Sequence, residues 1–258
     1  MITSTQNPKI KEIRGLQARS KTRRAAGAFV VEGVRLAEEA LQAGWQPQLV
    51  IYTEDLNERG LALVEAWQSQ SVAVEAVSDH VMAAASDTQT PQGILLVLPM
   101  QIMPTPDQLD FALILDQMRD PGNLGTLLRT AAAAGAGAIF LPPGTVDVYA
   151  PKVIRSAMGA HFHLSIQALT WEAIEAQCKL YSLQVFLAAA GNGTPYTQAD
   201  FSQPLALLIG GEAHGAGQHA HHLATTAVHI PMPGTAESLN AAVAAAILTF
   251  EVVRQRTQ

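Results

Sequence analysis

The chain has 258 residues, of which 48% are apolar and only 15% are charged, and this composition excludes a disordered protein. Its formal net charge of −6 argues against a generally basic protein. The length allows one large domain or two smaller ones. No apolar run nears the roughly 20 residues that span a bilayer, and Met1-Ile-Thr-Ser does not have the basic and then apolar pattern of a secretory signal peptide. From these two features we expect a cytoplasmic protein. The single Cys178 excludes an internal disulfide and a cysteine-based zinc site, and we expect it to be a packing residue.

The first 24 residues differ in charge from the rest of the chain. They carry a formal charge of +6, which leaves −12 on the remainder. A basic arm on an acidic body is expected where the amino end contacts nucleic-acid phosphates, whereas the alternative is a solvated amphipathic helix. The charge pattern alone leaves both interpretations open. The candidate RNA-binding residues are Lys9, Lys11, Arg14, Arg19, Lys21, Arg23 and Arg24.

The pattern predicts a small α/β domain over residues 1–98. Short apolar runs indicate strands, and amphipathic spacing between them indicates helices, the first of which is expected to end at Gly44. The predicted strands are 28–33, 49–53, 72–74 and 93–98, and the predicted helices are 34–43, 59–70 and 78–84.

Residues 99–106 contain three prolines in eight positions and are predicted to form a linker to a second domain, 107–258. Continuous apolar runs in this domain imply strands buried on both faces, and so an α/β fold with a parallel sheet covered by helices on both sides. The predicted strands are 111–115, 138–141, 184–189, 205–209 and 227–230, and the predicted helices are 122–134, 150–158, 171–180, 218–224 and 238–254.

Three polar junctions follow strands of this domain, at residues 116–130, 208–215 and 230–240, where ligands of parallel sheets bind. In the first, Asn123 can cap or enter a helix. Arg129 follows six residues later on a different face, pointing over the sheet edge or into a partner subunit. In isolation, an ordinary capped helix with a surface arginine explains this segment better.

The second and third junctions favour a ligand site. Gly210 and Gly211 let the main chain approach a flat ligand, and Glu212 either neutralises an arginine, binds ligand hydroxyls or is a solvated loop charge. In the third junction we expect Ser238 to cap the next helix, with Asn240 as a second polar anchor, although a capped helix alone also explains it. The apolar cradle beside them would consist of Met232, Leu239 and the main chain of Ile230.

Two other kinds of site are disfavoured by spacing. No Lys-Ser/Thr follows Gly215 and no G-x-G-x-x-G follows the first strand, which argues against nucleotide triphosphate or dinucleotide chemistry. His214, His219, His221 and His222 lack the H-E-x-x-H spacing and an adjacent cysteine, so we expect no metal site and place them on the surface of a short helix.

In the order in which they occur, the three junctions resemble the three motifs of the SpoU (TrmH) family of RNA ribose 2'-O-methyltransferases. Segments 4–11 and 29–40 look like the substrate-binding domain of this family, which is similar to ribosomal protein L30e, and 151–160 resembles a segment between the first two motifs. The resemblance implies a SPOUT fold with a carboxyl-terminal trefoil knot, with S-adenosylmethionine against the knot in a homodimer. Ala216 stands where the family usually has a larger aliphatic residue.

The resemblance also implies the activity and the site. A methyl group would move from S-adenosylmethionine to a ribose 2'-hydroxyl, with 23S rRNA favoured because the full-length amino-terminal domain and basic arm are more like the rRNA-directed members. The alternatives are a tRNA 2'-O-methyltransferase and a noncatalytic RNA-binding dimer, which the intact motif set disfavours. The implied catalytic residues are Asn123, Arg129, Glu212, Ser238 and Asn240, and the implied cofactor contacts are Leu187, Gly191, Gly211, Ile230, Met232, Ser238 and Leu239.

Family proposals make Arg129 the base toward the ribose hydroxyl. An arginine, however, is almost never deprotonated, since its reference pKa lies above about 12. We therefore expect Arg129 to orient the ribose and to stabilise the developing alkoxide, with Asn123 and Glu212 fixing its direction.

Overall fold

The structure is a computed structural model that describes residues 1–212, 215–235 and 237–257. It divides into two compact units, 1–101 with 149–162 and 102–148 with 163–258. Among the described helices, none is long and apolar enough to cross a membrane.

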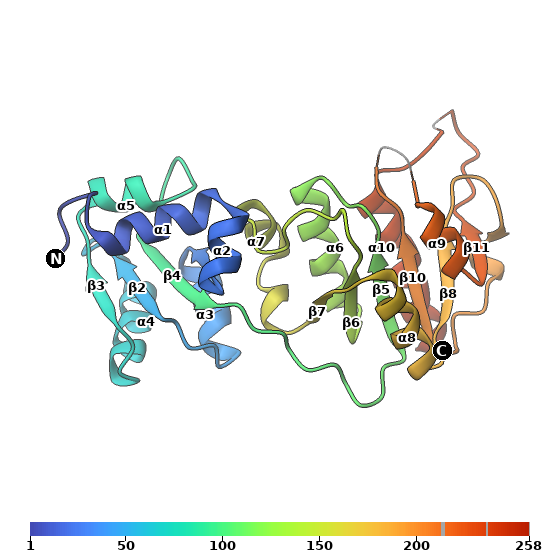
Figure 1. Cartoon of the computed structure of the whole chain (residues 1–258), viewed down its shortest axis with the longest axis horizontal. Helices are drawn as coiled ribbons and strands as arrows, with labels where there is room; N and C mark the ends of the chain where they lie inside the picture. Colours follow the sequence, from blue (N-terminus) through green and yellow to red (C-terminus); the bar gives the residue numbers. More distant parts are fainter. Residues whose placement is uncertain (213–214, 236, 258) are drawn as a thin grey trace. The chain divides into compact units, whose positions relative to one another are not determined.

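The first unit is a sheet with helices on both faces (Figure 1). Its elements are α1 (Pro8–Ala18), α2 (Ser20–Ala26), β1 (Ala28–Glu32), α3 (Val34–Gln42), β2 (Leu49–Tyr52), α4 (Glu58–Ser69), β3 (Val74–Ala76), α5 (Asp79–Ala85) and β4 (Ile94–Pro99). The strands lie in the order β1-β4-β2-β3, with β4 antiparallel to β1 and β2, and β3 parallel to β2. Each predicted element of this unit is present, with ends shifted by one or two residues.

The basic arm folds as the first two helices of this unit. Asn7 caps α1 by accepting the Lys9 N–H, and Pro8 occupies the first turn, where it costs no hydrogen bond. Ile10, Ile13 and Leu16 recur on one face of α1 and pack with the sheet in an apolar core. The side chains of Lys11 and Arg14 on the other side of α1 are therefore left exposed.

The segment 149–162 belongs by its contacts to the first unit, whereas the sequence-based division gave it to the second domain. It contains the predicted helix as α7 (Pro151–Ala157), followed by the short turn η1 (Ala160–Phe162). The ring of Tyr149 lies 4.8 Å from that of Phe29, and Phe162 lies 5.3 Å from Trp45. These aromatic contacts with residues far away in the sequence hold the segment in the first unit. A local sequence pattern does not predict such contacts.

The second unit is built on one parallel sheet. Its elements are β5 (Phe111–Leu115), α6 (Pro121–Ala133), β6 (Ala138–Leu141), β7 (Ser165–Ala168), α8 (Trp171–Leu180), β8 (Gln184–Ala188), β9 (Thr194–Pro195), η2 (Tyr196–Gln198), β10 (Leu205–Ile209), α9 (Gln218–Leu223), β11 (Thr226–His229) and α10 (Ala241–Arg256). The strand order is β7-β6-β5-β10-β8-β11-β9, and every neighbouring pair is parallel.

The sheet of the second unit is covered on both faces, as the sequence predicts. On one face, Ile174 and Cys178 of α8 and Ala220 of α9 pack on strand residues that include Ala112. The neighbouring strand residue Phe111 points the opposite way, and the Arg256 guanidinium of α10 lies over its ring at 5.6 Å. Since α10 also packs against α6, these two helices cover the other face. The edge strands β7 and β9 were not predicted, because they are short and carry no apolar run.

We expect Trp45→Ala to lower the free energy of unfolding of the first unit by about 3–5 kcal/mol, because the indole is buried between Phe29 and Phe162. Trp45→Phe should lose less, since among the described residues the indole N–H has no hydrogen-bond partner. Urea unfolding followed by circular dichroism measures both. The control is Gln68→Ala, an exposed position on α4 of the same unit, where the change should stay within about 0.5 kcal/mol. A loss below about 1 kcal/mol for Trp45→Ala would contradict this packing.

Candidate functional site

The first junction starts the helix α6 at the carboxyl end of β5. Asp120 caps this helix, its Oδ1 accepting the Asn123 N–H at 2.8 Å, and Pro121 occupies the first helical position. Of the two possibilities left open by the sequence, Asn123 therefore enters the first turn. Its side chain stays free to contact other segments.

The third junction starts α10, and Asn240 caps it. The Oδ1 atom of Asn240 accepts the N–H groups of Ala242 and Val243 at 2.9 and 3.3 Å. The prediction that Ser238 caps this helix is wrong, because the helix begins only at Ala241 and Asn240 stands directly before it. Serine and asparagine are comparable caps, so the sequence alone did not decide between them.

A chain of hydrogen bonds joins side chains from all three junctions. The Asn123 Nδ2 donates to Glu212 Oε1 at 2.9 Å, and the Asn240 Nδ2 donates to Asn123 Oδ1 at 3.1 Å. The main-chain N–H of Arg119 also points to Glu212 Oε2, at 3.4 Å. The structure thus brings together three of the five predicted catalytic residues. Asn123 stands at the centre because an amide both donates and accepts.

Glu212 is held as a carboxylate by neutral donors. Partial burial alone would raise its pKa, but hydrogen bonds from the Asn123 side chain and from main-chain N–H groups outweigh burial, so the pKa of Glu212 lies below its ordinary value. A carboxyl whose pKa is lowered from about 4.5 is ionised at neutral pH. The Glu212 side chain therefore carries a negative charge at neutral pH.

The loop that follows β10 packs tightly against the loop that follows β5. A Cβ atom on Gly211 would lie 2.5 Å from the carbonyl oxygen of Gln117, and a Cβ on Gly210 would overlap the main-chain nitrogen of Ala216. Only glycine fits at both positions. The buried Asp116 carboxylate accepts the Gly217 N–H at 2.8 Å and fastens the far end of the same loop. The positions of Gly211, directly before Glu212, and of Gly217 are thus fixed against the loop that follows β5.

A cavity of about 430 Å³ lies beside this chain of hydrogen bonds, at the carboxyl ends of β8, β10 and β11. Its walls are mostly apolar, and its polar side chains are those of Glu212, Ser238 and Asn240. The volume falls within the roughly 300–1,000 Å³ of small-molecule sites, and apolar walls with a few polar anchors suit a cofactor with a flat ring. Its lining includes five of the seven predicted cofactor residues, namely Gly211, Ile230, Met232, Ser238 and Leu239.

The other two predicted cofactor residues do not line this cavity. Leu187 is buried on the sheet face that packs against α8 and α9, and Gly191 lies in the loop beyond β8. Ala188 to Ala190 line the cavity in their place. Alternation along β8 was the signal that the sequence analysis missed, since Leu187 and Ala188 must point to opposite faces.

Arg129 is not part of this arrangement. It is exposed on α6 and, within the described residues, it makes no hydrogen bond or ion pair. The expected contact with Asn123 and Glu212 is absent from the described part of the chain, because residues six positions apart on a helix face different directions. Any role in the reaction needs a second component that approaches the exposed face of α6.

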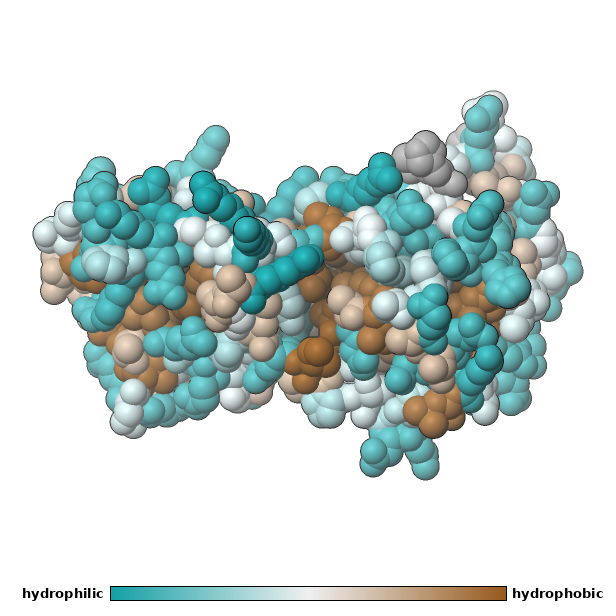
Figure 2. Space-filling model, in the orientation of Figure 1, coloured by the Kyte–Doolittle hydropathy of each residue, from teal (hydrophilic) through white to brown (hydrophobic). Residues whose placement is uncertain are grey.

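The structure separates the seven basic residues of the arm into two groups. Lys9 forms an ion pair with Glu75, and the buried Arg23 donates to the carbonyl oxygens of Leu16 and Gln17 at 2.6 and 3.1 Å. The surface over α1 and α2 is strongly hydrophilic (Figure 2). The exposed basic residues there are Lys11, Arg14, Arg19, Lys21 and Arg24.

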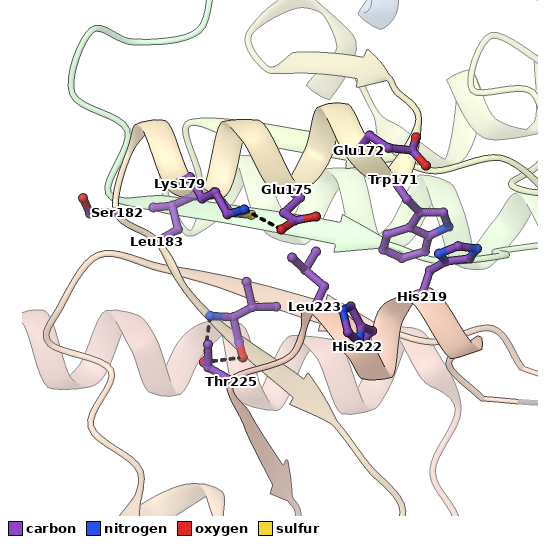
Figure 3. A pocket seen from close by; sticks show the side chains of 12 residues that line it. Trp171, Glu172, Glu175, Lys179, Ser182, Leu183, His219, His222, Leu223 and Thr225 are labelled. Atoms are coloured by element: carbon purple, nitrogen blue, oxygen red, sulfur yellow. Dashed lines mark hydrogen bonds and ion pairs between the residues drawn. The ribbon is translucent and has the colours of Figure 1, made fainter.

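A second cavity, of about 470 Å³, opens between α8 and α9. Figure 3 shows Trp171 and His219 side by side, with their rings stacked 5.9 Å apart, and Glu175 in an ion pair with Lys179 at 2.6 Å. Burial raises the pKa of the Cys178 thiol to about 11, so it stays protonated at neutral pH. The thiol is therefore a poor nucleophile at neutral pH, as expected of a packing residue.

The histidines that follow the second junction are exposed where the structure describes them. His219, His221 and His222 lie on α9, and His214 lies outside the described residues. Among the residues that the structure describes, no three His, Cys, Asp or Glu side chains are placed to hold a metal ion.

Comparison with known proteins, over both units, gives the family that the three motifs resemble. The profile of the SpoU rRNA methylase family matches residues 110–250, and that of the MRM3-like substrate binding domain matches residues 7–96. The chain is 34% identical to the 23S rRNA (guanosine(2553)-2'-O)-methyltransferase RlmP of Bacillus subtilis (strain 168), over 97% of this chain and 98% of that protein. It is 30% identical to the 23S rRNA (uridine(2479)-2'-O)-methyltransferase of Streptomyces viridochromogenes, over 98% and 92%.

A solved structure shares the fold. The AdoMet-bound rRNA methyltransferase from Sinorhizobium meliloti superimposes with a TM-score of 0.87 at 31% identity, covering 98% of this chain and 97% of that one. The parallel sheet and the smaller amino-terminal unit agree with these matches. The chain belongs to the SpoU rRNA methylase family and is an RNA methyltransferase.

Proposed function

We propose that this protein transfers a methyl group from S-adenosylmethionine to a ribose 2'-hydroxyl of 23S rRNA. The observation that carries the proposal is the hydrogen-bond chain Glu212–Asn123–Asn240 beside a mostly apolar cavity. Relatives named as 23S rRNA 2'-O-methyltransferases match nearly the whole chain, and a structural neighbour holds AdoMet. Because these two curated relatives are bacterial, we place the reaction in the cytoplasm.

The cavity residues are proposed to bind the cofactor. When bound, S-adenosylmethionine supplies a methyl group on a positively charged sulfonium. Met232, Leu239 and the small residues at the end of β8 offer apolar walls for its adenine ring, while Ser238 and Asn240 offer polar anchors. The hydrogen-bonded carboxamides hold the edge of the cavity in one geometry, so that much of the rate comes from positioning.

Arg129 is proposed to act on the ribose of an RNA that is bound at the cavity of a second subunit. Its exposure and the absence of any bond to the described trio favour action across an interface over action within one chain. A guanidinium remains charged, so it would orient the ribose and stabilise the developing alkoxide, and the 2'-hydroxyl proton would leave to solvent or another acceptor.

The exposed apolar residues of α10 support a proposed homodimer whose interface lies on the second unit. Val243 and Phe250, seven residues apart and therefore on one helical face, are each 49% exposed, and Leu239 nearby is 38% exposed. The helix α10 packs beside α6, which carries Arg129. An interface on this side would therefore bury the apolar stripe and bring the arginine toward a partner.

We also propose that the carboxyl-terminal part of the second unit is knotted, as in the family. The strand order supports this, because β10 lies between β5 and β8 and the later β11 lies on the far side of β8. In the proposed knot, the chain after β8 threads between earlier segments of this unit before α10 packs on α6.

We expect Met232→Arg to weaken binding of S-adenosylmethionine by about 100-fold or more, because the new side chain fills the cavity and leaves a charge among apolar walls. Calorimetric titration of the purified protein measures the affinity. The matched control is Ile102→Arg, at an exposed position of the same unit away from the cavity, which should bind like wild type. Equal binding by the Met232→Arg variant would place the cofactor elsewhere.

Mixed dimers test whether Arg129 acts across the interface. One differently tagged subunit carries Arg129→Ala and the other carries Asn240→Ala, and the mixed dimer is purified through both tags. If the arginine serves the partner's cavity, one intact site is restored and the dimer should show about half the wild-type methyl transfer, since one of two sites works. Each homodimer is the inactive control. A mixed dimer as inactive as the homodimers would show that Arg129 acts within its own chain.

Neutralising the exposed side of the arm should weaken RNA binding in a salt-dependent way. For Lys11→Gln combined with Arg14→Gln, we expect the slope of log affinity against log salt to fall by about 1.5, because each lost phosphate contact removes about 0.7–0.9. Filter binding of a 23S rRNA fragment at several salt concentrations measures the slope. Lys9→Gln is the control on the same helix, since Lys9 is already paired with Glu75. Equal slopes for both variants would remove the RNA-binding role of α1.

A further inference from the structure

The cavity beside the three junctions has an unbalanced charge. Among the described residues that line it, Glu212 is the only ionisable side chain, and the others are apolar or neutral. A ligand therefore enters a mostly apolar site that carries one negative charge. Glu212 is itself exposed at the edge of the cavity, so its charge is partly solvated and acts on a ligand with a moderate strength.

The Glu212 carboxylate has no cationic counterpart in the described part of the chain. The bonds recorded for it come from the Asn123 amide and from main-chain N–H groups, all of them neutral donors. These donors fix its orientation without neutralising it, and each carboxylate oxygen keeps acceptor capacity. A charge that is held in place but not compensated is available to a ligand.

We propose that the Glu212 carboxylate makes this cavity select for positively charged ligands, so that it binds S-adenosylmethionine in preference to its neutral-sulfur product S-adenosylhomocysteine. The inference rests on the proposed function and adds a role for Glu212 in cofactor exchange. It concerns the charge of Glu212, apart from the contribution of its side chain to the geometry of the site.

The reaction itself changes the charge that Glu212 faces. When the methyl group moves, the bond between its carbon and sulfur breaks, the electron pair of that bond stays on sulfur, and a new carbon–oxygen bond forms at the ribose. The hydroxyl proton leaves, and the sulfonium becomes a neutral thioether. The attraction to Glu212 is thus present before transfer and absent after it. The carboxylate favours loading of the cofactor and release of the product.

The test is calorimetric titration of wild type and Glu212→Gln with three ligands. They are S-adenosylmethionine, S-adenosylhomocysteine and sinefungin, in which an amine-bearing carbon replaces the sulfonium and restores a positive charge. Wild type should bind both cationic ligands about tenfold more tightly than S-adenosylhomocysteine, since a charge pair near a protein surface supplies a difference of that order. In Glu212→Gln the preference should fall to about twofold, with the affinity for S-adenosylhomocysteine retained.

Two controls separate charge from structure. Glutamine keeps a carbonyl oxygen that accepts the Asn123 amide, so the hydrogen-bond chain is preserved. Glu237→Gln makes the same chemical change at an exposed position outside the cavity lining and should leave the wild-type preference intact. Raising the salt concentration should reduce the preference of wild type, because the charge is partly open to solvent.

The outcomes distinguish this inference from the proposed function. Equal weakening of all three ligands in Glu212→Gln would show a purely positional role and overturn the inference. So would an unchanged preference, as expected if a cation from a second copy neutralised Glu212. A folded wild type that bound none of the three ligands would contradict the proposed function itself.

Discussion

The site depends on one carboxamide. Asn123 donates to Glu212 and accepts from Asn240, and these partners lie 89 and 117 residues away in the sequence. An aspartate at this position would face Glu212 with a second negative charge, and an alanine would leave both partners without their bonds. Glu212 lies in the loop after β10, and Asn240 caps α10. The Asn123 amide therefore fixes the position of this loop relative to the first turn of α10.

The strand order makes the hydrogen bond between Asn123 and Glu212 possible. β10 pairs with β5 on one side and with β8 on the other, so the loops that leave all three strands meet at one edge of the sheet. Glu212 follows β10 and Asn123 follows β5, so parallel pairing brings them within hydrogen-bond distance. An antiparallel arrangement would have put these loops at opposite ends. The parallel topology therefore positions the hydrogen-bonded side chains of the site in addition to forming the core.

Sequence alone predicted those parts of the molecule that depend on local pattern. The apolar runs indicated the central strands of the second unit, and the three junctions indicated the edge where the cavity lies. What remained open depended on contacts between distant residues. Arg23 belongs to the same charge run as Arg24, yet it is buried against the carbonyl groups of α1 while Arg24 is exposed. Likewise, the segment 149–162 packs in the first unit through aromatic contacts with Phe29 and Trp45, which are distant in the sequence.

The distribution of charge links the proposed dimer to the proposed chemistry. Within the described residues, the cavity and its hydrogen-bond chain contain a carboxylate and two amides but no cation. A methyl transfer to a hydroxyl develops negative charge on oxygen, and a site that offers only a carboxylate and neutral groups leaves that charge without a positive counterpart. The guanidinium of Arg129 could meet this need, but it points from the exposed side of α6. This separation is the reason for proposing that a second subunit completes the site, because each chain would then contribute the group that the other lacks.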